Sequence, residues 1–361
     1  MSKRTPLYDL HLEMGAKMVD FGGWDMPLRY GSQIEEHHQV RKAAGMFDVS
    51  HMSIVDFTGA DVKALLQYLF ANDVARLKTP GKALYTCMLN HDGHVLDDLI
   101  IYYMNDNWYR IVFNAATHDK DIAWVKSQMG DYDVTMNEQS GAAMIAVQGP
   151  QAPAAVVALF DDAEADRIRD LKPFNAIEVD DCFVARTGYT GEDGYEIIVD
   201  GSRAADMWRA LALEGVKPIG LGARDSLRLE AGMNLYGSDM DESTTPLVAG
   251  LGWTIAWEPV ERDFIGRKAL EEQKAAGVPA KFVGLLLEGK GVLRAHQPVN
   301  VEGVGEGEIT SGGFSPTLDR SIAFARVPAA TGDTCTVAIR GKQVPAKVVK
   351  TVFVRNGKSC L

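Results

Sequence analysis

The sequence predicts a mixed α+β protein with more than one domain. Segments with helical periodicity alternate with short strand-like runs over the first three quarters of the chain, whereas strand-like runs alone follow Gly277. A chain of 361 residues, 46% of them hydrophobic and 24% charged, suits two or three domains and is able to bury a large core. We therefore expect an α+β region followed by an all-β module.

Caps and apolar stripes mark the helical segments. Ser32-Gln-Ile-Glu35 has the pattern of a capping box and Gly45 is suited to end a helix in the left-handed conformation, which predicts a helix near 33–44. Between Val62 and Phe70, apolar residues recur at i, i+3, i+4, i+7 and i+8, the stripe of a core-facing helix. Similar stripes predict further helices around 118–128, 151–160, 203–214 and 266–276.

Short runs rich in β-branched and aromatic residues, bounded by Gly, Asn or Asp, predict strands. In the first three quarters of the chain they are VLDDLIIYYM, YRIVFNA, AMIAVQG, CFVART and YEIIVD. Beyond Gly277 they are KFVGLLLEG, EGEITSG, SIAFARV, TCTVAIR and AKVVKTVFV, which predict the all-β module.

Charge and cysteine content exclude several classes of protein. A net charge of -12 argues against a nucleic-acid partner, because that binding relies on clustered Lys and Arg. No run approaches the 18 apolar residues of a membrane span, and no apolar targeting segment follows the basic start. The cysteines at 87, 182, 335 and 360 are far apart and lack CxxC pairing, which favours reduced thiols and a cytoplasmic protein.

Metal and nucleotide motifs fail their physical requirements. His91 and His94 have no cysteine partner at zinc-ligand spacing. Asp225 occupies the third-glycine position after Gly220 and Gly222, where it would repel a pyrophosphate. No GxSxG elbow is present. The sequence therefore predicts neither a metal site nor a dinucleotide site.

Three segments carry unusual polar residues. Asp97 and Asp98 stand inside a strand-like run, and strand alternation sends the two carboxylates to opposite faces without telling which one faces a cavity. In the alternative interpretation, both carboxylates only satisfy backbone donors of the preceding turn. RTGYTGEDGYE surrounds Glu196 with glycines that allow close backbone approach, or it forms an ordinary hairpin with an exposed glutamate. Arg224 opens a predicted helix, where it can hold an anion or remain a surface charge.

Long blocks of the sequence, in order, resemble the aminomethyltransferase or T-protein family of the glycine cleavage system. The blocks are TPLYDLH, GAKMVDFGGWDMPLRYGSQIEEHHQVRKAAGMFDVSHM, NHDGHVLDDLIIYY, AVQGP, RTGYTGEDGYE, GLGARDSLRLEAGMNLYGSDMDE, DFIGRKAL and ITSGGFSPTLDRSIAFARV. They run essentially from one end of the chain to the other. A chance match at so many collinear places is very improbable.

The resemblance implies a three-domain cloverleaf around a central folate cavity, with a C-terminal β-barrel or jelly-roll-like domain. Residues 1–52 with 141–240 are expected to form a discontinuous α+β folate-binding domain. Residues 53–140 with 241–276 are expected to form a second α+β domain that carries the catalytic aspartate, and residues 277–361 the all-β domain.

The resemblance also implies the reaction. An aminomethyl group on the lipoyl arm of the H-protein gives its methylene to tetrahydrofolate, and the products are ammonia, 5,10-methylenetetrahydrofolate and the dihydrolipoyl H-protein. The P-protein and L-protein are expected as loosely associated components of the same system. No metal is expected.

Site residues are carried over position by position. The resemblance assigns Asp98 as the catalytic carboxylate and Glu196 as the anchor of the pterin ring, whose 2-amino-pyrimidinone edge offers two parallel N–H donors. The remaining residues of the folate cavity are expected to be Tyr85, Tyr189, Arg224, Asn114, Met52 and, at the glutamate end, Arg355.

Other functions on the same scaffold are a non-enzymatic folate-binding relative, a folate-dependent demethylase and the folate module of an amine dehydrogenase. The non-enzymatic relatives carry a KGCYxGQE-like block that this sequence lacks. A flavin domain would not fit within 361 residues. The intact HVLDDLIIYY and RTGYTGEDGYE blocks favour the transferase.

Overall fold

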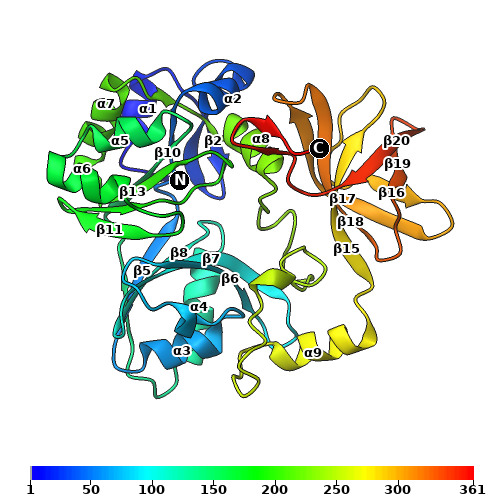
Figure 1. Ribbon diagram of the computed structural model, residues 1–361, viewed down its shortest axis with the longest axis horizontal. Helices are drawn as coiled ribbons and strands as arrows, with labels where there is room; N and C mark the ends of the chain where they lie inside the picture. Colours follow the sequence, from blue (N-terminus) through cyan, green and yellow to red (C-terminus); the bar gives the residue numbers. More distant parts are fainter. Residues whose placement is uncertain (1) are drawn as a thin grey trace. The chain divides into compact units, whose positions relative to one another are not determined.

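The computed structural model describes residues 2–361 (Figure 1). These residues fall into two compact units. The first comprises the chain up to Leu65 together with Val74–Tyr85 and Leu99–Asp225, and the second comprises Leu66–Asp73, Thr86–Asp98 and Ser226–Leu361. Each unit has an apolar core of its own. The three-domain division expected from the resemblance stays a prediction.

A six-stranded sheet carries the main core of the first unit. In order across the sheet its strands are β11 (Ala176–Val179), β12 (Cys182–Ala185), β13 (Gly194–Asp200), β10 (Ala142–Gln148), β4 (Gly45–Asp48) and β14 (Lys217–Pro218). One face is covered by α1 (Tyr8–Glu13), α5 (Ala152–Val157), α6 (Asp162–Arg169) and α7 (Ala204–Leu213) (Figure 1). Trp208 of α7 is completely buried there against alternate residues of β10 and β13.

A second sheet has the order β6-β7-β8-β5-β9. Its strands are β6 (Ala83–Leu89), β7 (Val95–Asn105), β8 (Trp108–Phe113), β5 (Ser53–Thr58) and β9 (Thr135–Glu138). Nearby in sequence are α3 (Val62–Leu69) and α4 (His118–Gln128). The apolar stripe predicted between Val62 and Phe70 is confirmed, because its five residues are fully buried.

Three short strands near the start of the chain form a sheet of their own. They are β1 (Lys3–Arg4), β3 (Trp24–Arg29) and β2 (Lys17–Phe21). The next helix, α2 (Gln33–Lys42), starts as predicted, because the Ser32 hydroxyl accepts a hydrogen bond from the Glu35 amide. The helix ends at Lys42, two residues before the predicted end, but the left-handed role predicted for Gly45 is wrong. Gly45 has no left-handed conformation; it opens β4, where a Cβ atom would lie 2.7 Å from Val40 and 2.4 Å from Ile219.

A closed barrel lies in the C-terminal part of the second unit and confirms the predicted all-β module. Its strands, in order around the barrel, are β15 (Ala280–Leu287), β18 (Arg320–Pro328), β17 (Gly305–Ser315), β16 (Pro298–Val301), β19 (Thr334–Ile339) and β20 (Lys342–Val349). Alternate residues fill the interior, among them Leu285, Val299 and Val337, which are fully buried.

The remaining elements connect or extend these cores. They are the helices α8 (Leu221–Ala231) and α9 (Arg267–Ala276), the 3-10 turns η1 (Val74–Arg76), η2 (Gly201–Arg203) and η3 (Gly252–Thr254), and the hairpin strands β21 (Val354–Arg355) and β22 (Lys358–Ser359). Leu229 of α8 packs with Phe324 and Phe353 on the outside of the barrel. Across residues 2–361, no helix is both long enough and apolar enough to span a membrane.

Candidate active site

Glu196 projects from the face of the six-stranded sheet that the helices leave uncovered. Its neighbours along β13, Tyr195 and Ile197, are both buried in the helix-covered core. Because side chains alternate along a strand, Glu196 must point to the opposite face. It is only 8% exposed, so its carboxylate is a buried acid and not the exposed glutamate of an ordinary hairpin.

Small side chains flank this carboxylate on both sides. Ala146 of β10 and Ala185 of β12 stand directly opposite Glu196 on its two neighbouring strands, and each is 1% exposed. Residues paired in this way share one face of the sheet, with Cβ atoms only about 4.5–5.5 Å apart. The two methyl groups therefore make a flat, apolar surround for one polar group.

Two hydroxyl groups connect Glu196 to the second sheet. The Thr187 hydroxyl donates to Glu196 Oε2 at 2.5 Å, and the Tyr102 hydroxyl lies 3.1 Å from the Thr187 oxygen. Tyr102 comes from β7, and its ring meets that of Phe183 in β12 edge-on at 5.0 Å. Thr187 and Tyr102 are both buried, so the contacts are shielded from water.

Opposing effects act on the pKa of this carboxyl group. Burial raises the pKa of Glu196, while the Thr187 hydrogen bond and the positive charge of Arg224 act in the opposite direction. The net result is a pKa above the ordinary range of about 4.3. Acids with pKa values perturbed in this way are concentrated at functional sites.

Arg224 lies in the first half of α8, and its charge acts on several groups of the first unit. Its guanidinium carbon lies 4.6 Å from the ring centroid of Tyr189, a cation–π arrangement. Burial, together with the charge of Arg224, lowers the pKa of His51 to about 4, so His51 is neutral at pH 7. The predicted residues Tyr189, Arg224 and Glu196 therefore belong to one electrostatic neighbourhood.

Two glycines of RTGYTGEDGYE, Gly188 and Gly194, serve the protein's own packing. A Cβ atom on Gly188 would lie 2.0 Å from the Gln148 amide oxygen, and one on Gly194 would lie 2.0 Å from the Val147 carbonyl oxygen. Gln148 in turn donates to the Thr187 carbonyl at 3.1 Å. The sequence predicted that these glycines let another group come close to the backbone. In the structure, the groups that come close are the Gln148 side chain and the Val147 carbonyl of the same sheet.

Met52 and Asn114 lie beside each other at one end of the second sheet. Ser53 of β5 pairs with Phe113 of β8, and Met52 and Asn114 are the next residues beyond this pair. Both are half-buried, as is Tyr85 in β6.

The aspartate pair belongs to the second unit. Asp97 is completely buried, whereas Asp98 is half-buried. Burial raises the pKa of the nearby Cys87 thiol, and the charges of Asp98 and Asp97 add to that effect. Strand alternation thus leaves Asp98 as the more accessible of the two carboxylates.

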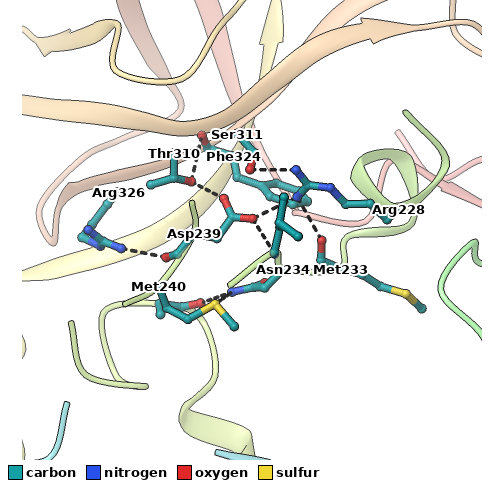
Figure 2. Close-up of polar contacts among 11 residues, drawn as sticks. Arg228, Met233, Asn234, Asp239, Met240, Thr310, Ser311, Phe324 and Arg326 are labelled. Carbon is teal, nitrogen blue, oxygen red and sulfur yellow. Dashed lines mark hydrogen bonds and ion pairs between the residues drawn. The ribbon is translucent and has the colours of Figure 1, made fainter. Parts of the chain in front are cut away.

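A second buried charge cluster lies in the second unit, and Figure 2 shows its members. Arg228 of α8 donates to Asp239 at 2.9 Å and to Ser311 of β17 at 2.9 Å. Thr310 also donates to Asp239, at 2.5 Å, and the Arg326 guanidinium binds the Asp239 carbonyl at 2.8 Å. These contacts fasten α8 and the loop after it to the barrel.

Metal ligands are not grouped in the described part of the chain. Within residues 2–361, no set of three or more His, Cys, Asp or Glu side chains is arranged to hold a metal ion. The thiols of Cys87, Cys182 and Cys335 are buried and free, and that of Cys360 is exposed and free.

Comparison with known families accounts for nearly the whole chain. Residues 7–259 match the model of the GCVT N-terminal domain, and residues 281–355 match that of the glycine cleavage T-protein C-terminal barrel domain. The chain belongs to the glycine cleavage T-protein family. The resemblance and the mixed fold with a C-terminal barrel are therefore confirmed.

Individual T-proteins are similar over their full length. An aminomethyltransferase of Pseudomonas syringae pv. tomato is 58% identical over 361 residues, covering 100% of both chains. One of Nitrosococcus oceani is 55% identical, covering 100% of this chain and 97% of the relative. The crystal structure of the glycine cleavage system aminomethyltransferase T from Bartonella henselae superposes with a TM-score of 0.92 at 34% identity, covering 99% of each chain.

Several polar residues around Glu196 were missed by sequence reasoning. Thr187, Tyr102 and Gln148 contact the glutamate or the loop that precedes it. Thr187 stands within the RTGYTGEDGYE block, and its position beside the glutamate strand was the available signal. Tyr102 is 85 residues from Thr187, and no local pattern links them.

Proposed function

We propose that the protein is a tetrahydrofolate-dependent aminomethyltransferase of the glycine cleavage system. It takes the aminomethyl group from the lipoyl arm of the H-protein, releases ammonia and forms 5,10-methylenetetrahydrofolate. Full-length relatives named aminomethyltransferases, at 55–58% identity, support this function over the demethylase and the non-enzymatic alternatives. The structural observation that carries the proposal is the buried, alanine-flanked carboxylate of Glu196.

This carboxylate fits the polar edge of a pterin. Two parallel N–H donors of the 2-amino-pyrimidinone can bind a carboxylate as an arginine fork does. A planar ring needs flat, apolar surroundings, which Ala146 and Ala185 provide beside Glu196. Thr187 uses one acceptor position of the carboxylate, and a carboxylate offers about four. The residues present therefore suit the ligand.

Asp98 is the proposed catalytic carboxylate. As ammonia leaves, the methylene carbon becomes electron-poor, and a fixed anion stabilises that developing charge. The same carboxylate can hold the hydrogen of the folate N10 for attack. One observation supports the assignment: Asp98 is half-buried, whereas Asp97 is completely buried.

The other predicted contacts are also proposals. Tyr189 and Tyr85 offer an aromatic face and a hydroxyl to the folate, and Arg224 offers a cation to a ligand oxygen or carboxylate. Met52 and Asn114 line the same cavity, and Arg355 meets the glutamate end. The cation–π contact of Arg224 with Tyr189 and the adjacent positions of Met52 and Asn114 support these assignments.

Partners and location follow from the same proposal. The lipoylated H-protein is a transient partner because its arm carries the aminomethyl group, and the P-protein and L-protein complete the system. The reaction needs no metal and takes place in the cytoplasm.

A reconstituted reaction tests the function. The protein is mixed with aminomethyl-loaded H-protein and tetrahydrofolate, and ammonia and methylenetetrahydrofolate are followed. We expect both products to form together, at a rate that falls sharply when folate is omitted. A protein that yields neither product is not this transferase.

Glu196→Ala tests the pterin anchor. Losing a charged hydrogen-bonding partner costs about 1.5–3 kcal/mol, so the Kd for tetrahydrofolate in calorimetry should rise roughly 10- to 100-fold. Glu178→Ala removes an exposed glutamate from β11 of the same sheet and serves as the matched control. An equal Kd for the two variants would rule out the anchor.

A further inference from the structure

We propose that Tyr102 and Thr187 form a hydrogen-bonded chain that holds Glu196 ionised and oriented for tetrahydrofolate. Both would be positioning residues, because they act on the ligand through Glu196. The inference rests on the proposed function and extends it to side chains that the family resemblance did not assign.

The number of protons on each group determines which hydroxyl donates and which oxygen accepts. An ionised carboxylate only accepts hydrogen bonds, so Thr187 must direct its single O–H toward Glu196 Oε2. The Thr187 oxygen then has only acceptor capacity left, and Tyr102 must donate to it across 3.1 Å. If Glu196 instead carried a proton, this order could reverse. The hydrogen bond that Thr187 donates acts against burial on the pKa of Glu196, and in this way it favours the charged form.

Glu196 needs this support because it is buried. Removing a carboxylate from water without a full set of partners is costly, and burial is the largest influence raising the pKa of Glu196. Arg224 is a cation that acts on it, and the residues paired with it on β10 and β12 are alanines. Tyr102 hydrogen-bonds to Thr187. Burial also raises the pKa of Tyr102, so its hydroxyl stays protonated and remains a donor.

Neighbouring hydrogen bonds support the series Tyr102–Thr187–Glu196. The Gln148 amide donates to the Thr187 carbonyl at 3.1 Å, and the Thr190 hydroxyl donates to the Gln148 amide oxygen at 2.9 Å. These three residues are at most 6% exposed. These contacts hold the backbone of Thr187, from which its hydroxyl reaches Glu196.

The test compares Thr187→Val with Thr187→Ser. Valine keeps the shape of threonine without the hydroxyl, whereas serine keeps the hydroxyl. The Kd for tetrahydrofolate is measured by calorimetry between about pH 5.5 and 8.5, since an anchor that must be ionised weakens as pH falls through its pKa. For Thr187→Val we expect a Kd about tenfold higher at pH 7, as the loss of a hydrogen bond to a charged group implies, with the deficit shrinking at high pH. Thr187→Ser should restore the wild-type profile, and Tyr102→Phe should shift it less in the same direction.

Thr190→Val is the matched control. It removes a buried hydroxyl from the same loop, but that hydroxyl donates to Gln148 and not to Glu196. If Thr187→Val and Thr190→Val weaken binding equally at every pH, the effect is only structural and the inference is wrong. An unchanged Kd for Thr187→Val would overturn it as well. Failure of the proposed function looks different, because wild type would then yield neither ammonia nor methylenetetrahydrofolate in the reconstituted reaction, whatever the Kd values of these variants.

Discussion

Two buried carboxylates of this protein differ in how they are satisfied. Asp239 is fully buried and accepts from Arg228, from the Leu235 amide and from Thr310 (Figure 2). Glu196 is nearly as buried, yet the hydrogen bond it receives within the first unit comes from the neutral hydroxyl of Thr187.

The difference separates a structural acid from one that we propose to be functional. A buried acid surrounded by an ion pair and two further donors has its charge balanced by the fold itself, so its purpose is to fasten segments together. A buried acid whose pKa stays raised is held in a state that the fold alone does not favour. Such a group has capacity left for a ligand.

Asp98 should show the largest effect on catalysis. Asp98→Asn keeps the shape of the side chain and removes the charge that stabilises the electron-poor carbon, so turnover should fall about 10²- to 10⁴-fold. The Kd for tetrahydrofolate should stay close to that of wild type. Turnover is measured with aminomethyl-loaded H-protein. The control is Asp92→Asn, an exposed aspartate in the turn before β7. Equal turnover in both variants would remove Asp98 from its role.

Thermal unfolding tests the two buried acids directly. Asp239→Asn leaves the Arg228 charge buried without its ion-pair partner, so it should cost about 3–5 kcal/mol of folding free energy. Glu196→Gln removes a desolvated charge and should leave Tm unchanged or raise it. The comparison fails if Glu196→Gln destabilises the protein as much as Asp239→Asn does.

The pH dependence of that experiment has a definite sign. Because the pKa of Glu196 is raised in the folded state, the folded protein holds this proton more tightly than the unfolded chain. Stability attributable to Glu196 is therefore lost as pH rises from the ordinary carboxyl pKa of about 4.3 through the raised value. Wild type and Glu196→Gln should converge in Tm in acid and separate toward neutral pH, with the variant the more stable.

Much of the fold could be predicted from local patterns. The cap at Ser32, the stripe from Val62 to Phe70 and the all-β module each depend on residues close in sequence. The role of Gly45 could not be predicted, because a side chain there would collide with Ile219, a residue far along the chain. Local periodicity contains no information on such approaches.

Some features of the candidate site could likewise be predicted from the sequence, and others could not. The resemblance supplied Glu196 and Arg224, and the structure brings their charges into one neighbourhood. It could not supply the contact of Tyr102 with Thr187, which depends on two strands from different sheets. Whether Asp98 shares a cavity with Glu196 stays a prediction.

Ala146→Val should have a moderate effect on binding. A larger side chain opposite Glu196 would take up space beside the carboxylate, where the pterin is proposed to lie. The Kd for tetrahydrofolate should therefore rise about tenfold, which corresponds to about 1.4 kcal/mol. Ala142→Val is the matched control, since Ala142 lies four residues away on the same face of β10, opposite Asp200. Similar Kd values for both variants would show that the methyl group of Ala146 does not shape the site.

The smallest effect is expected at Arg355. It pairs with Lys358 across the β21–β22 hairpin, and both side chains are exposed, so two cations stand side by side where they would attract an anionic polyglutamate. Exposed charge pairs are worth about 0.2–1 kcal/mol, so Arg355→Ala should weaken binding of a pentaglutamyl folate at most about fivefold, less so at high salt. The monoglutamate should bind as in wild type, and Lys342→Ala, an exposed lysine of β20, should change neither. Equal losses for the two folates in competition binding would place Arg355 away from the glutamate tail, because a residue at the tail can discriminate only between ligands that differ there.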